Sequence, residues 1–305
     1  MRATPIFLSR HYWLYAVSIK RALASAFTAF GVLWLAVQII SFFSTDGAEW
    51  LRSRPLLFGT IGLVYAIWNS RPVIRVVNTI AGRDVHIELR VADIFGLPGA
   101  VVVSTNTTFE TDMVSGLIAK DTIQGAFTSL YYDSADYLRR DLELQLPSGH
   151  GQQVVRAGKT LLSYAVGTTA RVTARDRVGY FVALTVLNDH GTASATFDDL
   201  KRALPTFWEF VAARGNMETL LVPILGSGRA RIPQKRDVII REIVQSFVAA
   251  CSDHRFCDSL VIVISPKDFR EHDLDLKVLG AFVRHICTYT EFKTASARGT
   301  GTGIG

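Results

Sequence analysis

Cysteine is scarce in this chain of 305 residues, and formal charge is absent from one long stretch near its start. The three cysteines, Cys251, Cys257 and Cys287, have neither metal-ligand spacing nor the even count of a disulfide framework, so they fit reduced cytosolic thiols. No basic run is interleaved with aromatic residues, which argues against binding of nucleic acid. The chain also lacks a Walker motif, a dinucleotide fingerprint and any Ser-His-Asp or metal-ligand cluster that would supply a catalyst.

The uncharged stretch is Ala22–Phe43, in which most residues are apolar. As a helix it is roughly 33 Å long, enough to cross a bilayer core of about 30 Å. A core helix of a soluble domain is the alternative, but such a helix rarely needs so long an apolar run. No small-residue cleavage site follows, so we expect the segment to stay in the mature protein. The sequence therefore predicts a membrane span here.

A second uncharged segment, residues 55–70, follows after a short link. It is short for a span, about 24 Å of helix, so a re-entrant or interfacial helix is the alternative. Lys and Arg concentrate before the first segment and after the second, which predicts a multi-pass protein with both termini in the cytoplasm. Gln38 in the first segment and the small residues Gly62 and Ala66 in the second favour self-association, although simple anchors share such features.

The remainder of the chain alternates predicted strands and helices. Strands are expected at 85–91, 100–104, 168–173, 180–187, 219–225 and 260–265, and helices at 112–130, from Thr196 to near Gly215, and around 238–247. The helix that starts at Thr196 has a capping box with Asp199. This order predicts an α/β (α/β/α) sandwich with a largely parallel central sheet. The expected organisation is an N-terminal cytoplasmic segment (1–21), a transmembrane hairpin (22–71, spans 22–43 and 55–70), a ligand-binding domain (80–290) and a disordered tail (291–305).

Three loops that follow predicted strands carry the candidate binding residues. Asp93 and Ile94 end one strand, where a carboxylate could accept a hydrogen bond from a purine amine, although an Asp at a strand end is more often only a turn former. Thr105, Asn106 and Thr107 leave the next, where Asn106 could face ribose hydroxyls, although helix capping by these side chains is the simpler explanation. Gly226, Ser227, Gly228 and Arg229 lie between a strand and a helix, and could cradle a phosphate; the alternative is a tight turn with solvated arginines.

In this order, the three loops resemble the macro domain, an α/β/α module that binds ADP-ribose. Ala92-Asp93-Ile94 approximates its early Gly-Asp-Ile motif, Val103-Ser104-Thr105-Asn106 its Asn-Ala-Ala-Asn motif, and Pro223 through Gly228 its phosphate loop. The resemblance implies that Asp93 holds adenine and Asn106 faces the distal ribose. Hydrolases of the family carry a Gly-Gly-Gly run after that Asn, whereas this chain has Phe109-Glu110-Thr111-Asp112-Met113. The departure puts hydrolysis in doubt, and Asp112 or Glu110 could instead contact a cationic substituent on the ribose. For Asp112, an acid that stabilises a helix N-terminus is the simpler reading.

Two N-terminal spans joined to such a domain are similar to the membrane-spanning effector of the type II Thoeris anti-phage system. That resemblance implies a non-enzymatic protein of the bacterial inner membrane with no cofactor and no metal. Its macro domain would sense histidine-ADP-ribose made by a TIR-domain partner. The effector as a whole would then self-associate and disrupt the lipid bilayer. A membrane-anchored ADP-ribosyl hydrolase and a passive nucleotide-binding scaffold are the alternatives.

Overall fold

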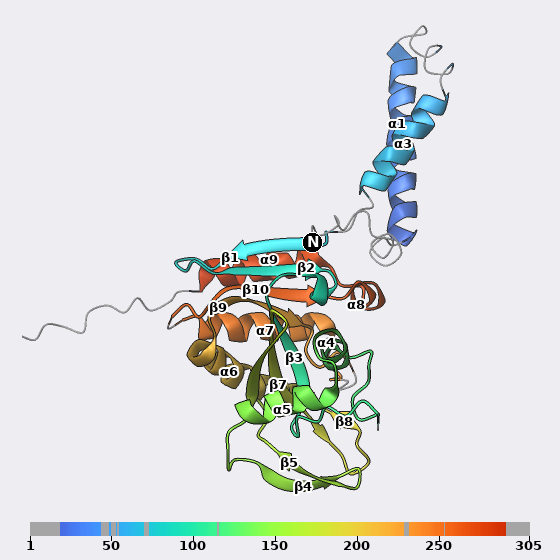
Figure 1. Ribbon diagram of the computed structural model, residues 1–305. Coiled ribbons are helices and arrows are strands. Elements are labelled where there is room, and N and C mark those ends of the chain that lie inside the picture. The colour runs from blue at the N-terminus through green and yellow to red at the C-terminus, as the bar shows by residue number, and fades with distance from the viewer. Residues whose placement is uncertain are drawn as a thin grey trace, which may run out of the picture. The chain divides into compact units, whose positions relative to one another are not determined.

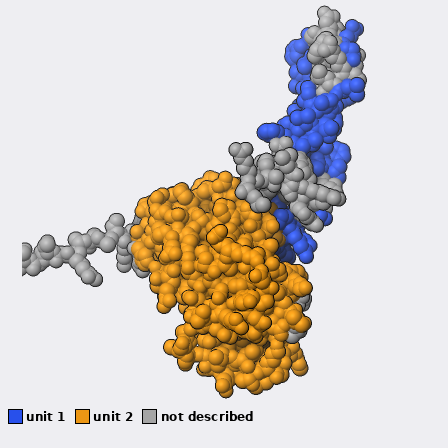
Figure 2. Space-filling view, viewed as in Figure 1, with its two compact units in different colours: residues 1–74, 266–273 blue, residues 75–265, 274–305 orange. Residues whose placement is uncertain are grey.

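The chain divides into two compact units, residues 1–74 with 266–273 and residues 75–265 with 274–305 (Figure 2). The computed structural model describes residues 19–43, 49, 53, 55–69, 73–114, 116–228, 232–252 and 254–290. The predicted N-terminal cytoplasmic segment, apart from residues 19–21, and the whole of the predicted tail lie outside these ranges, as does Arg229.

Two antiparallel helices, α1 (Ile19–Phe43) and α3 (Pro55–Asn69), form the described part of the first unit together with α8 (Pro266–Glu271) (Figure 1). Of the described helices, α1 is the one long and apolar enough to cross a membrane, over Ala22–Phe43, and only 11% of its most apolar window is buried. Helix α3 has 15 residues, and its Gly62 lies against Phe30 and Leu33 of α1. The small-residue face predicted on this helix is therefore in use within the chain, against α1.

The second unit is built on a mixed, mostly parallel sheet (Figure 1). Its strands lie in the order β1-β2-β10-β9-β3-β7-β6, with β8 beside β7; β1, β6 and β8 are antiparallel to their neighbours. The strands are β1 (Arg75–Thr79), β2 (His86–Val91), β3 (Ala100–Asn106), β6 (Thr169–Ala174), β7 (Arg177–Leu187), β8 (Ala193–Ser194), β9 (Met217–Pro223) and β10 (Cys257–Ile264). The α/β architecture with a largely parallel central sheet that the alternating pattern predicted is thus confirmed. The sheet begins at Arg75, five residues before the predicted domain start.

Helices cover both faces of this sheet. They are α4 (Ile123–Tyr131), α5 (Ala135–Gln145), α6 (Phe197–Arg214), α7 (Arg236–Ala250) and α9 (Leu276–Tyr289). Successive residues of β7 point to opposite faces: Tyr180 packs edge-on against Phe207 of α6, and Phe181 packs edge-on against Phe127 of α4. All four rings are at most 1% exposed, and burial of a large apolar side chain contributes about 1.5–3 kcal/mol. These stacks fix both layers to the sheet.

The structure corrects the sequence predictions in two segments. The predicted helix 112–130 forms only from Ile123, because the Thr122 hydroxyl caps it by accepting from the Gly125 backbone N–H. No strand is predicted between residues 130 and 168, yet a two-stranded arm forms there from β4 (Gln152–Arg156) and β5 (Lys159–Ser163). By contrast, the predicted capping box at the start of α6 is present in both directions.

All three cysteines are buried, and burial raises the pKa of each thiol above its ordinary value. Only a thiolate reacts readily with a disulfide reagent, and these thiols lack both charge and access. We therefore expect that the detergent-solubilised native chain, mixed with a chromogenic disulfide at pH 8, does not rapidly displace the coloured thiol of the reagent. The same chain in denaturant should displace three equivalents of that thiol per chain, one for each cysteine. Rapid release of even one equivalent from native protein would contradict the buried placement.

Candidate functional site

The carboxyl ends of four parallel strands meet at one edge of the sheet. Val91 at the end of β2 pairs with Ile264 at the end of β10, and Val263 of β10 pairs with Pro223 at the end of β9. Strand β3 pairs with β9 as well, with Val101 opposite Leu221, and runs in the same direction. Loops that leave such ends form the usual crevice for a ligand in α/β sheets. The segments that contain Asp93, Asn106 and Gly226 all start at this edge, so tertiary structure brings the three predicted loops to one side of the domain.

Asp93 caps a short 3-10 turn, η3 (Ile94–Gly96), at the end of β2. One carboxylate oxygen accepts from the Phe95 backbone N–H at 3.1 Å, and the side chain is exposed. The other oxygen has no partner within the described residues, which leaves it open to a donor. Ile94 is buried, and its carbonyl accepts from Arg177 Nη2 at 3.2 Å. Arg177 thus fixes the turn that presents Asp93, a role that no local sequence signal indicates.

Asn106 lies at the end of β3 and is 3% exposed. Its Oδ1 accepts three hydrogen bonds, from the Thr108 backbone N–H (3.2 Å), the Thr108 hydroxyl (2.8 Å) and the Glu110 backbone N–H (3.0 Å). The amide oxygen therefore holds the following loop. The Nδ2 group has no partner within the described residues, and it is the part of this side chain left for a ligand.

The threonines on either side of Asn106 have different surroundings. Thr107 binds neighbouring strands: its backbone N–H donates to the Thr185 carbonyl (2.7 Å), and its hydroxyl accepts from Ser163 on β5 (3.1 Å). Thr105 is buried, and its hydroxyl has no partner in the described part of the chain. Neither threonine caps the next helix, which starts at Ile123.

The acidic residues after Asn106 are occupied within the protein. Glu110 is buried, and its Oε1 accepts from the backbone N–H groups of Thr111 (2.9 Å) and Asp112 (3.0 Å). Asp112 Oδ1 accepts from the Val114 backbone N–H (2.8 Å), and Oδ2 lies 2.7 Å from Lys159 Nζ on the β4–β5 arm. This hydrogen bond raises the pKa of Lys159. The prediction that Asp112 stabilises a helix N-terminus is wrong, because no helix starts there; its charge is instead neutralised by a residue that sequence reasoning missed.

Glycine is required at one position of the loop after β9. Gly226 has φ +72°, and a Cβ there would lie 2.2 Å from Ile232 Cδ1. The Gly226 carbonyl accepts from the Ile232 backbone N–H (3.2 Å), and the Ser227 carbonyl accepts from Arg236 Nη2 (2.7 Å), so both ends of the loop are tied to the chain that follows. The backbone N–H groups of Gly226 and Gly228 have no partner within the described residues. Free N–H groups in a tight turn before a helix suit an anion.

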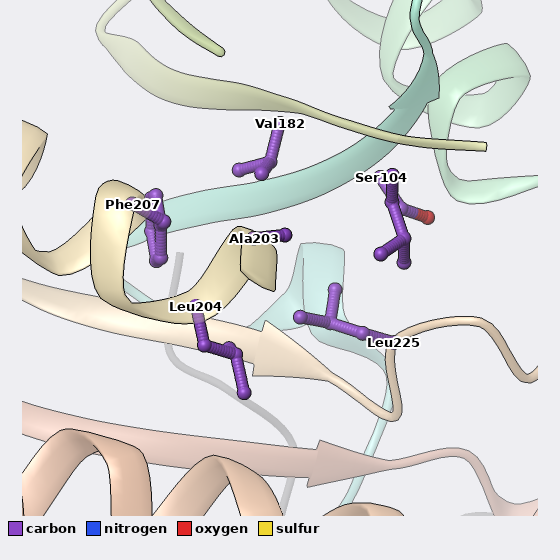
Figure 3. Close-up of a pocket in the computed structure, with 7 residues that line it drawn as sticks. Ser104, Val182, Ala203, Leu204, Phe207 and Leu225 are labelled. Carbon is purple, nitrogen blue, oxygen red and sulfur yellow. The ribbon is translucent and has the colours of Figure 1, made fainter. Parts of the chain in front are cut away.

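A small cavity lies behind this edge, between the sheet and α6 (Figure 3). Its lining residues are Ser104, Val182, Leu184, Ala203, Leu204, Phe207 and Leu225. It offers about 10 Å³, the space of roughly one water molecule. A nucleotide does not fit inside it, so the candidate site is the open edge of the sheet. Among the described residues, no group of three His, Cys, Asp or Glu could hold a metal ion.

Comparison with known proteins identifies a family. Residues 87–265 match the family model described as the macro domain of Thoeris protein ThsA. Among solved structures, a mutant Oceanobacillus iheyensis macrodomain with ADPR has a TM-score of 0.43 and 16% identity, covering 67% of this chain and 98% of that one. A Trypanosoma brucei macrodomain in complex with ADP-ribose has a TM-score of 0.42 and 12% identity, with 66% and 68% covered. A search of curated proteins found no match.

Proposed function

The chain belongs to the macro-domain family of Thoeris ThsA proteins, and we propose that it is a membrane effector whose macro domain senses an ADP-ribose-derived signal. The observation that carries this proposal is the convergence of three loops, those of Asp93, Asn106 and Gly226, at one edge of the sheet. Each offers a group without a partner among the residues that the structure describes: a carboxylate oxygen, an amide N–H₂ and backbone N–H groups.

In the proposed complex, each of these groups takes one part of ADP-ribose. The exposed carboxylate of Asp93 accepts from the adenine amine beside Ile94, and Asn106 Nδ2 donates to a hydroxyl of the distal ribose. The backbone of Gly226, Ser227 and Gly228, together with Arg229, holds the diphosphate. Thr105 lines the site, while Thr107 supports it through its bonds to neighbouring strands.

The loop after Asn106 supports binding rather than hydrolysis. Where hydrolases that the sequence resembles carry glycines, this chain has the buried side chains of Phe109 and Glu110, and Glu110 is bonded to the loop backbone. The loop is thus fixed and bulky beside the distal ribose. Asp112 and Lys159 form a partly exposed ion pair beside this loop, so a group on that ribose would meet a paired carboxylate and not a free one. A membrane-anchored ADP-ribosyl hydrolase remains the competing function.

The proposed output lies in the N-terminal helices. Helix α1 spans the inner membrane, α3 returns across it, and both termini face the cytoplasm, where a TIR-domain protein makes the signal. Binding of the signal to the macro domain then promotes self-association of protomers and disruption of the bilayer. The apolar exposure of α1 supports this arrangement: Phe27 is 77% exposed and Trp34 68%. Such side chains on a soluble protein would form a large apolar surface.

Calorimetry separates the proposed function from its competitors. Titration of the detergent-solubilised full-length chain with ADP-ribose and with histidine-ADP-ribose should release heat, and chromatography of the mixture should return the ligand intact. If neither ligand releases heat, the proposed sensing function is wrong. Recovery of a cleaved ligand would favour the hydrolase. Binding without any rise in mass by light scattering would favour a passive scaffold.

A further inference from the structure

Helix α1 has one face that packs on α3 and an opposite face whose residues are exposed. The packed face carries Ser25 and Ala29, both buried, and the Ser25 hydroxyl accepts from Asn69 Nδ2 of α3 at 3.3 Å. On α3, the buried Gly62 meets α1 directly. The small and polar groups on this side of α1 are therefore used inside one protomer.

The opposite face repeats every seven residues. It consists of Ala24, Thr28, Gly31, Leu35 and Gln38, all exposed. The alternating steps of four and three residues keep these positions on one side of a helix, in the pattern that gives left-handed helix pairs. A Cβ built at Gly31 would have no neighbour within 4 Å, so a second backbone can approach closely there.

Gln38 is the polar residue of this face that lacks a hydrogen-bond partner in the described chain. Its amide has no hydrogen-bond partner within the described residues, whereas the Thr28 hydroxyl is satisfied by the Ala24 carbonyl at 2.9 Å. Gln38 lies five residues inside the end of the apolar stretch, about 7 Å from it along the helix, so its amide sits among hydrocarbon. An amide in that medium needs a polar partner from another helix.

We infer that this face of α1 binds the same face of a second copy of the chain, with the two Gln38 amides paired across the contact. A primary amide both donates and accepts, so two copies related by a twofold axis satisfy one another. The small residues Ala24 and Gly31 on the same face allow the two α1 backbones to approach closely. This inference rests on the proposed membrane location and names the surface through which the proposed clustering occurs.

Cysteine cross-linking in native membranes tests the contact. Leu35→Cys places a thiol in the face, and Trp34→Cys places one about 100° around the helix at nearly the same depth and exposure, 68% against 60%. Oxidation of full-length protein should yield disulfide-linked dimer from Leu35→Cys and little from Trp34→Cys. Adding Gln38→Leu to Leu35→Cys should lower the apparent association constant about 3- to 30-fold, the range for interhelical amide bonds in lipid. Gln38→Asn should restore part of it.

Equal cross-linking at both positions, or no effect of Gln38→Leu, would overturn the inference. Two readouts on the same preparation separate this from a failure of the proposed function: recovery of the chain in the membrane fraction, and binding of ADP-ribose. If both are normal without a Leu35→Cys dimer, only the α1 contact is refuted. If the chain is not in the membrane fraction, the proposed function fails and the contact with it.

Discussion

Replacing Gly226 by alanine is expected to lower the affinity for ADP-ribose at least tenfold. Two features of the structure cause this effect: the backbone has φ +72°, and the new Cβ would lie 2.2 Å from Ile232 Cδ1 and 2.6 Å from its Cγ1. Backbone strain of this kind costs about 1–3 kcal/mol. The variant can relieve the strain by moving the loop, but binding requires the loop in place, and about 1.4 kcal/mol corresponds to a tenfold change in affinity.

The same loop supplies a matched control in Gly228. A Cβ at Gly228 meets nothing within 4 Å, so Gly228→Ala should leave the thermal unfolding midpoint unchanged, whereas Gly226→Ala lowers it. Calorimetry and thermal unfolding on the three proteins provide the measurements. If Gly228→Ala is stable but binds more weakly, the phosphate approaches that backbone directly. Wild-type affinity in Gly226→Ala would show that the loop does not hold the ligand.

Replacing Asn106 by alanine should abolish ligand binding and destabilise the domain. The change removes the acceptor for the backbone N–H groups of Thr108 and Glu110 and for the Thr108 hydroxyl. A buried donor left without a partner costs about 1–3 kcal/mol, so we expect a loss of about 2–4 kcal/mol in the free energy of unfolding. The loop from Thr107 to Asp112 then loses its anchor beside the proposed ribose position. Chemical denaturation and calorimetry measure the two effects.

Asn106→Asp separates the two roles of this side chain. Aspartate keeps an oxygen in the place of Oδ1 and therefore an acceptor for all three hydrogen bonds, but it lacks the Nδ2 donor. We expect the free energy of unfolding of Asn106→Asp to be closer to that of the wild type than the value for Asn106→Ala. We also expect Asn106→Asp to bind ADP-ribose at least tenfold more weakly than the wild type. If Asn106→Asp binds as tightly as wild type, Asn106 acts only on the loop and does not touch the ligand.

Local signals predicted the elements whose cause is local. The Thr196 and Asp199 pair caps α6 as expected, since a capping box involves only neighbouring residues. The buried strands β3 and β10 were found from continuous apolar runs. Helix α5 was missed because only Leu138 and Leu142 along it are buried, too thin an apolar stripe to recognise. The stretch 112–122 was assigned to a helix because Met113 and Leu117 imitate helical spacing, whereas Thr122 sets the true start.

The candidate site shows a similar division. The residue types of its three loops were visible in the sequence, and so was their position after predicted strands. Their internal bonds were not: Lys159 lies 47 residues after Asp112, and Arg177 lies 83 residues after Ile94. These partners decide which atoms stay free for a ligand. On α3, likewise, the small residues Gly62 and Ala66 suit close packing against another helix, and only the structure shows that Gly62 packs against α1.

Local patterns are enough to predict the apolar stretch Ala22–Phe43, the alternating α/β pattern and the order of the binding loops, because hydrophobic periodicity, caps and glycine turns act within a few residues. The fold decides which distant groups pair: the Asp112 carboxylate is held by Lys159 and the Ile94 carbonyl by Arg177, while Asn106 Nδ2 and Gln38 are left without partners in the described chain. The Asn106 oxygen, by contrast, is held by residues only two and four positions later. The physical reason for the difference is that partners 47 and 83 residues apart can bond only after the fold brings their segments together.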